Sequence, residues 1–94
     1  MAALNEAEIE QRMQGAGEWT RGEGDTIVRD FRLADFAAAI SLVERVAQVA
    51  ESANHHPDIL VHGWNKVRLT LSTHSEGGLT DADFALAEQI DRVA

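Results

Sequence analysis

The chain has 94 residues, which is enough for one domain with one hydrophobic core but lies near the lower end of the size range for unaided folding. Its formal net charge of −8, with only eight scattered basic residues, disfavours nucleic acid and anionic lipid as direct partners. It has no cysteine, which excludes disulfides, thiolate nucleophiles and thiolate metal sites. The longest apolar run, residues 36–40, is far short of the roughly 20 residues of a membrane span, and the acidic N-terminus is unlike a signal peptide. We therefore predict a single domain over residues 1–94 that is located in the cytoplasm.

The first third of the chain predicts a helix followed by two strands. Asn5 and Glu8 have the spacing of a capping box, so a helix is expected over residues 6–14. Glycines then separate a short strand at residues 18–21 from a longer one at residues 26–33, in which apolar and polar residues alternate.

A long helix is predicted next. From Asp35, a good N-cap residue, apolar residues recur at spacings of three and four. The helix should end near residue 53, because Asn54 favours a turn and Pro57 biases the residue before it away from helical geometry. The residues that follow this helix are therefore expected to form a loop.

The last third predicts two more strands and a final helix. Residues 59–61 are expected to form a short strand, and residues 65–73 alternate cleanly between apolar and polar side chains. Gly77 and Gly78 predict a turn, after which Thr80 and Asp83 have the spacing that begins a helix.

This order of elements predicts an α+β fold. Two hairpins separated by a long amphipathic helix would form one four-stranded antiparallel sheet with three helices on one face, a two-layer sandwich of order α-β-β-α-β-β-α. A small sheet has edge strands with unpaired backbone groups, and edges can join across a two-fold axis. We therefore expect a homodimer, or a homotetramer built from such dimers.

Three of the four histidines lie within two dozen residues. His55 and His56 occupy the loop after the long helix, and His74 follows the strand of residues 65–73. Imidazole both gives and takes protons near neutral pH, so three converging histidines would suit acid–base catalysis. Glu51, one helical turn before His55, could orient an imidazole. The alternative is that the histidines are solvated loop residues and that Glu51 is an exposed residue at a helix end.

Other chemistry has weaker support in the sequence. A metal site is disfavoured because neighbouring side chains such as His55 and His56 point apart in an extended segment, and no H-x-H or H-E-x-x-H pattern occurs. No serine lies in a G-x-S-x-G setting, which disfavours nucleophilic catalysis. Trp19 and Trp64 could each stack on a planar aromatic substrate, or both could belong to the core.

Motifs along nearly the whole chain resemble those of the pterin-4a-carbinolamine dehydratases. The matching residues are Trp19, Ile27, Arg29, Phe31, Asp35 and Phe36 in the first half, and Glu51, His55, His56, Pro57, Trp64, residues 65–67, residues 69–74, Gly78, Leu79 and Asp83 in the second. The resemblance implies a hydro-lyase that dehydrates a 4a-hydroxytetrahydropterin to the quinonoid dihydropterin in tetrahydrobiopterin recycling, with no metal and no organic cofactor. The predicted order of helices and strands agrees with the fold of this family.

The resemblance also implies roles for individual residues. His55 and His74 match the acid–base pair, and His56 matches a residue that orients or binds the pterin. The supporting or substrate-binding positions are Glu51, Asn54, Trp19, Pro57 and Asp83. The chain departs from the family at Asn54, where many members have Asp, and at Ala82, where some have Arg.

A different class of function stays open, because some relatives of these enzymes act as partner proteins. Animal members help a homeodomain transcription factor to dimerise, and degenerate bacterial relatives resemble assembly chaperones of a carbon-fixing enzyme. A protein that only binds partners has no need to keep His55, His56 and His74 together. Their presence therefore favours the enzyme.

Overall fold

The computed structural model describes residues 2–94. Its elements follow the predicted order, with one additional turn of 3₁₀-helix, η1, before the last helix. They are α1 (Glu6–Gln14), β1 (Thr20–Arg21), β2 (Ile27–Arg32), α2 (Phe36–Ala53), β3 (Asp58–His62), β4 (Lys66–Leu71), η1 (His74–Glu76) and α3 (Asp81–Val93).

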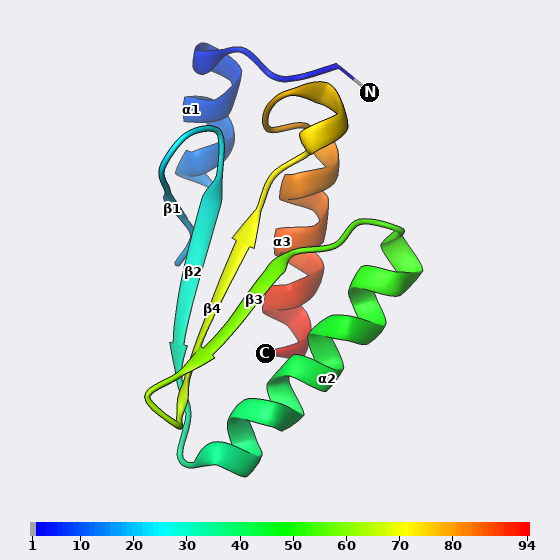
Figure 1. The fold of residues 1–94 in the computed structure, drawn as a ribbon. Helices are drawn as coiled ribbons and strands as arrows, with labels where there is room; N and C mark the ends of the chain where they lie inside the picture. The colour runs from blue at the N-terminus through cyan, green and yellow to red at the C-terminus, as the bar shows by residue number, and fades with distance from the viewer. Residues whose placement is uncertain (1) are drawn as a thin grey trace.

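The four strands form one sheet in the order β1-β2-β4-β3, and all neighbouring strands are antiparallel. The three helices lie on one side of this sheet, and α2 and α3 lie side by side there (Figure 1). The predicted two-layer α+β fold is confirmed.

The core lies between the sheet and the helices, and the alternation along β4 accounts for it. Val67, Leu69 and Leu71 have no exposed surface and face the helices, whereas Lys66 and Arg68 on the other side are exposed. The helices bury an apolar stripe against these strand residues, and this removal of apolar surface from water is the main driving force for the fold. The buried residues from the helices and their flanking segments are Ile9, Trp19, Ala39, Leu42, Val46, Ala50, Leu79, Leu86, Ala87 and Ile90.

The helix caps predicted from sequence are confirmed. The side chain of Asn5 accepts from the backbone N–H of Glu8, and the Glu8 carboxylate accepts from the backbone N–H of Asn5, at 2.9 Å in both cases. Asp35 accepts from the N–H of Ala38 at 2.7 Å and begins α2. These side chains satisfy backbone donors that have no partner within a helix, which is why the helices begin at these residues.

Several strand boundaries differ from the prediction. β1 has only two residues, and β4 ends at Leu71 rather than at residue 73. Leu71 lies opposite Ile27, the first residue of β2, so beyond that point β4 has no partner strand. The hydroxyl of Ser72 instead donates to the backbone O of Asp25 at 2.8 Å, and the chain turns into η1.

The two tryptophans have opposite environments. Trp19 is buried in the core, whereas Trp64 is 62% exposed in the β3–β4 turn, where its φ of 60° follows a φ of 54° at Gly63. Of the two alternatives, a place in the core therefore holds for Trp19 and does not hold for Trp64.

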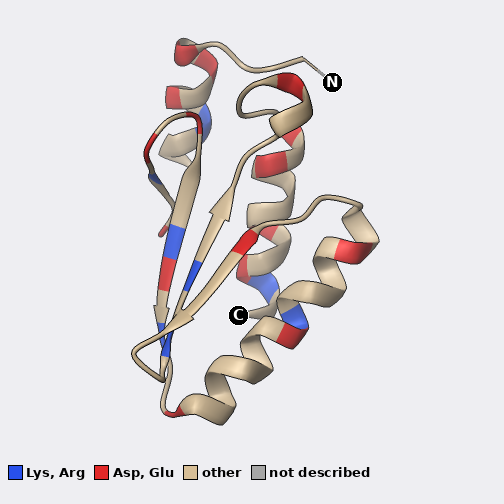
Figure 2. Ribbon diagram, viewed as in Figure 1, with Lys and Arg blue, Asp and Glu red and all other residues tan. Residues whose placement is uncertain are grey.

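The sheet face opposite the helices carries charged residues from β2 and β4 (Figure 2). Arg68 donates two hydrogen bonds to Asp30, directly across the β2–β4 ladder, at 2.8 and 3.1 Å. These hydrogen bonds hold the pKa of Asp30 below its ordinary value.

Within residues 2–94, no helix has both the length and the apolar character needed to cross a membrane.

Candidate active site

The end of α2 positions the first pair of histidines. Asn54 has left-handed backbone angles, φ 51° and ψ 42°, and the backbone N–H of His55 donates to the carbonyl of Ala50 at 3.1 Å. Asn is one of the few residues besides Gly that adopt this conformation readily, and the conformation ends a helix by satisfying its last carbonyls. After this turn the His55 side chain contacts α3.

His55 is paired with a buried carboxylate. Its Nε2 atom lies 2.5 Å from Oδ1 of Asp83, a side chain with no exposed surface, while 16% of the His55 side chain is exposed. Asp83 is the third residue of α3, and its expected capping role is confirmed because its Oδ2 atom accepts from the backbone N–H of Thr80 at 2.9 Å. One carboxylate thus both caps a helix and holds an imidazole.

A hydroxyl that the sequence reasoning missed completes this cluster. Thr73 donates to Oδ2 of Asp83 at 2.8 Å, and its oxygen lies 2.9 Å from that of Thr80. Thr73 shares the strand parity of Leu69 and Leu71, whose side chains face the core. A polar side chain at a core-facing position needs a hydrogen-bond partner in the interior. The threonine at the end of the apolar face of β4 was therefore the sequence signal for this cluster.

His74 follows Thr73 directly and is the first residue of η1, where it is exposed. The turn that holds it is closed by a backbone bridge between Thr73 and Gly78 and by a left-handed Gly77. The loop of His55 and the turn of His74 therefore meet at Asp83, which bonds the first directly and the second through Thr73. Asp83 therefore joins two loops that are far apart in the sequence.

His56 has a separate and exposed partner. Its Nε2 atom lies 2.5 Å from Oε2 of Glu51, and the two side chains are 57% and 76% exposed. Glu51 thus contacts His56 and not His55. Pro57 follows and is half-buried, and β3 begins at the next residue.

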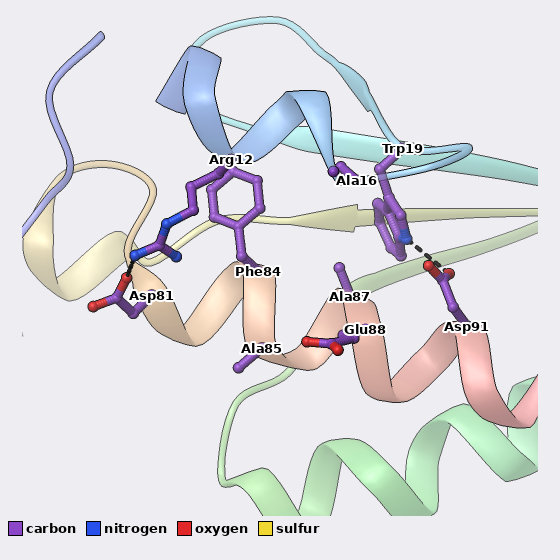
Figure 3. A pocket seen from close by; sticks show the side chains of 10 residues that line it. Arg12, Ala16, Trp19, Asp81, Phe84, Ala85, Ala87, Glu88 and Asp91 are labelled. Atoms are coloured by element: carbon purple, nitrogen blue, oxygen red, sulfur yellow. Dashed lines mark hydrogen bonds and ion pairs between the residues drawn. The ribbon is translucent and has the colours of Figure 1, made fainter. Parts of the chain in front are cut away.

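Trp19 lies apart from the histidines. Its Nε1 atom donates to Asp91 at 2.9 Å, and its ring lines a pocket of about 500 Å³ between α1 and α3 (Figure 3). Phe84 lines the same pocket beneath the guanidinium of Arg12, which forms an ion pair with Asp81. None of the histidines lines this pocket, so the structure does not bring Trp19 together with the rest of the predicted site.

The arrangement offers proton-transfer groups. Among residues 2–94, no three histidine or carboxylate side chains are grouped so as to hold a metal ion. His55 has a carboxylate on one ring nitrogen, which leaves its other ring nitrogen available to a ligand. The fourth histidine, His62, lies at the end of β3 on the open sheet face.

Comparison with known proteins agrees with this fold and these motifs. The family model of pterin 4 alpha carbinolamine dehydratase matches residues 2–93. A protein of Chloroflexus aggregans that carries a provisional pterin-4-alpha-carbinolamine dehydratase name is 50% identical over 93 residues, which cover 99% of this chain and 98% of that protein. A relative of Roseiflexus castenholzii with the same provisional name is 52% identical over 98% of this chain and 97% of its own length.

Solved structures show the same fold. A protein of Brucella melitensis described as a transcriptional coactivator/pterin dehydratase has a TM-score of 0.91 and 31% identity, with 98% of each chain covered. A pterin dehydratase-like protein identified as a RuBisCO assembly factor has a TM-score of 0.68 and covers 82% of this chain and 89% of its own, but at 24% identity it supports the fold alone. With the family model matched over residues 2–93 and half of all residues shared with full-length relatives, the chain belongs to the pterin 4 alpha carbinolamine dehydratase family.

Proposed function

We propose that this protein dehydrates a 4a-hydroxytetrahydropterin to the quinonoid dihydropterin, as the family name indicates. The observation that carries the proposal is the pairing of His55 with buried Asp83, which is joined through Thr73 to the turn of His74. The cluster holds the His55 imidazole and ties the turn that carries the exposed His74 to the same buried carboxylate, which supports a shared role for the two histidines. The absence of cysteine fits a reducing compartment, so we propose a cytoplasmic location.

The reaction needs two proton transfers and no change of redox state. The bond between carbon 4a and the hydroxyl oxygen breaks, and the oxygen leaves as water with a proton from an acid. A base takes the ring N–H proton as the carbon–nitrogen double bond forms. We assign the acid and base to His55 and His74, because two imidazoles can share these tasks at neutral pH.

The remaining predicted residues support the substrate in this proposal. The exposed His56, paired with Glu51, is available to bind the pterin. Asn54 shapes the loop that carries both histidines, and Pro57 continues it into β3. Binding of the pterin ring to Trp19 is the least supported of these assignments, because that side chain lines a different pocket.

The test is the rate of quinonoid dihydropterin formation from freshly generated 4a-hydroxytetrahydropterin in the presence of a chelator. We expect the intact protein to accelerate the reaction, His55→Ala to lose the acceleration, and His62→Ala, a matched histidine outside the cluster, to retain it. Folding of each variant is checked by circular dichroism. No acceleration by the intact protein would refute the proposal.

A partner-binding role is the second candidate, favoured by the coactivator and assembly-factor descriptions of the two solved relatives. The intact histidine cluster argues against such a role as the sole function, because binding a partner does not require paired imidazoles. A stoichiometric complex with an unrelated protein that persists in His55→Ala would support the second role.

We also propose that the protein forms a homodimer through β3. Within residues 2–94, β3 pairs only with β4, so its outer edge offers unpaired backbone groups, and its Leu60 side chain is more than half exposed. A free edge of this kind is a template for pairing with a second copy. Sedimentation at micromolar concentration should show a dimer or a tetramer, and a monomer alone would contradict this.

A further inference from the structure

The hydroxyl of Thr73 forms a hydrogen bond with Asp83 and none with the backbone of η1, the turn that Thr73 precedes. Thr73 occupies the N-cap position of η1, where a threonine side chain often accepts from the backbone, yet it makes no side-chain capping bond there. Its hydroxyl instead donates to Oδ2 of Asp83 at 2.8 Å. The structural role of this hydroxyl is therefore to bind the carboxylate that contacts His55.

The donors around Asp83 have fixed directions. The N–H of Ala82 donates to the Thr80 hydroxyl oxygen at 3.2 Å, and the N–H of Thr80 donates to Oδ2 of Asp83 at 2.9 Å. Since the single hydroxyl proton of Thr73 goes to Asp83, the 2.9 Å contact between the two threonines must use the proton of Thr80. Oδ2 therefore accepts two hydrogen bonds, and Oδ1 is left to face His55.

The acceptor role of Oδ1 also determines which nitrogen of His55 carries the proton. An ionised carboxylate can only accept, so Nε2 of His55 is the donor in the 2.5 Å contact with Oδ1 of Asp83. The proton that moves during the reaction must then be exchanged at Nδ1. Nδ1 makes no hydrogen bond with any of residues 2–94, and 16% of the His55 side chain is exposed.

We infer that Thr73 is a positioning residue: with Thr80, it orients the Asp83 carboxylate so that His55 is held with its proton on Nε2 and exchanges protons with the substrate through Nδ1. The inference rests on the proposed function for its role in catalysis, but the tautomer itself does not depend on any activity. Because Thr73 immediately precedes His74, the same hydroxyl also holds the turn that carries the second imidazole.

A purely structural role would predict something different. Thr80 and Asp83 already form a complete capping box for α3, so neither His55 nor Thr73 is needed to begin that helix. If Thr73 served only to satisfy a buried carboxylate, its loss would lower stability and leave the tautomer of His55 and the turnover number unchanged. Measurements of the His55 tautomer and of the turnover number therefore distinguish a positioning role of Thr73 from a purely structural one.

The first experiment uses Asp83→Asn in ¹⁵N-labelled protein. The amide oxygen of the variant must take the place of Oδ2, where it accepts from Thr80 and Thr73, so its NH₂ group faces His55. Nε2 must then accept, and neutral His55 should change from the Nε2–H to the Nδ1–H form. The two ring nitrogens of a neutral imidazole have well separated ¹⁵N chemical shifts, which report the change directly.

Glu51→Gln is the matched control, because its amide rotates freely in solvent beside His56 and should leave the His55 signals unchanged. A His55 that stays in the Nε2–H form in Asp83→Asn would overturn the inference whether or not the protein is an enzyme. A change to the Nδ1–H form together with an inactive wild-type protein would instead uphold the geometry and refute the proposed function.

The second experiment compares Thr73→Val with Thr73→Ser and remains informative if Asp83→Asn does not fold. Loss of a hydrogen bond to a charged group should lower kcat about 10- to 100-fold in the valine variant, with KM little changed. Serine keeps the hydroxyl and should restore most of the activity. A valine variant with unchanged kcat and a lowered melting temperature would leave Thr73 a structural residue only.

Discussion

His55 and Asp83 are 28 residues apart in the sequence, yet Nε2 of the histidine lies 2.5 Å from Oδ1 of the carboxylate. The contact joins the loop after α2 to the first turn of α3 and buries the carboxylate completely. His56 and Glu51 show the same pair of groups at the same distance, but in solvent. The two pairs should therefore differ sharply in their contributions to stability.

Replacing each carboxylate by alanine tests this difference. Asp83→Ala should lower the free energy of unfolding by about 3 kcal/mol or more, because the buried N–H of Thr80 and the partly buried donors of Thr73 and His55 lose their acceptor. Glu51→Ala should lower it by less than about 1 kcal/mol, since an exposed pair is screened by water. Urea denaturation of both variants measures the values, and equal losses would mean that the two pairs do not differ in burial as described.

His74→Ala should lower the turnover number by roughly 100- to 10,000-fold, the range for loss of a general acid or base. Its side chain is exposed, so the melting temperature should stay close to that of the wild type. His62→Ala is the matched control, because this residue is also an exposed histidine beside a turn. An unfolded His74→Ala variant would show that the imidazole has a structural role.

The left-handed backbone at Asn54 predicts an order of stability among its variants. Asn54→Ala should cost about 1–2 kcal/mol, because a Cβ without a polar group is disfavoured at φ 51°. Asn54→Gly should cost less, since glycine adopts this conformation without a steric penalty. Thermal unfolding of the two variants gives the order. If alanine were as stable as glycine, this turn would not require a left-handed residue.

The ion pair between Asp30 and Arg68 predicts a pH dependence of stability. Arg68 lowers the pKa of Asp30 in the folded state, so the pair stabilises the fold fully above the unfolded carboxyl value of about 3.9. That contribution is lost as the pH falls through the lowered folded value. The difference in stability between wild type and Asp30→Asn should thus be present at neutral pH, vanish in strong acid and shrink in high salt.

A double variant, Asp30→Asn with Arg68→Gln, checks that the effect comes from the pair. At neutral pH its coupling energy should be favourable and should decrease with added salt. A coupling that grows as the pH falls would have the wrong sign for a carboxyl group whose folded pKa is lowered.

Local sequence determined the elements of this protein and their ends. Asn5 with Glu8, Asp35, and Thr80 with Asp83 mark the starts of the three helices, because capping bonds span only a few residues and are visible as spacings. The alternation along β4 gave the buried face of the sheet for a similar reason: successive side chains of a strand point to opposite sides. The histidines could be selected as candidate site residues from their acid–base chemistry and from their places after the long helix and after β4.

Only the tertiary structure decided which partners these residues have. The sequence placed Glu51 one helical turn before His55, but in the structure Glu51 contacts His56, and His55 contacts Asp83 of α3. The commitment of Thr73 to Asp83 and the separation of Trp19 from the histidines also depend on how α3 packs against the sheet. Such contacts join residues that are far apart in the chain, and no local spacing encodes them, because they arise when the apolar faces of distant segments are buried together.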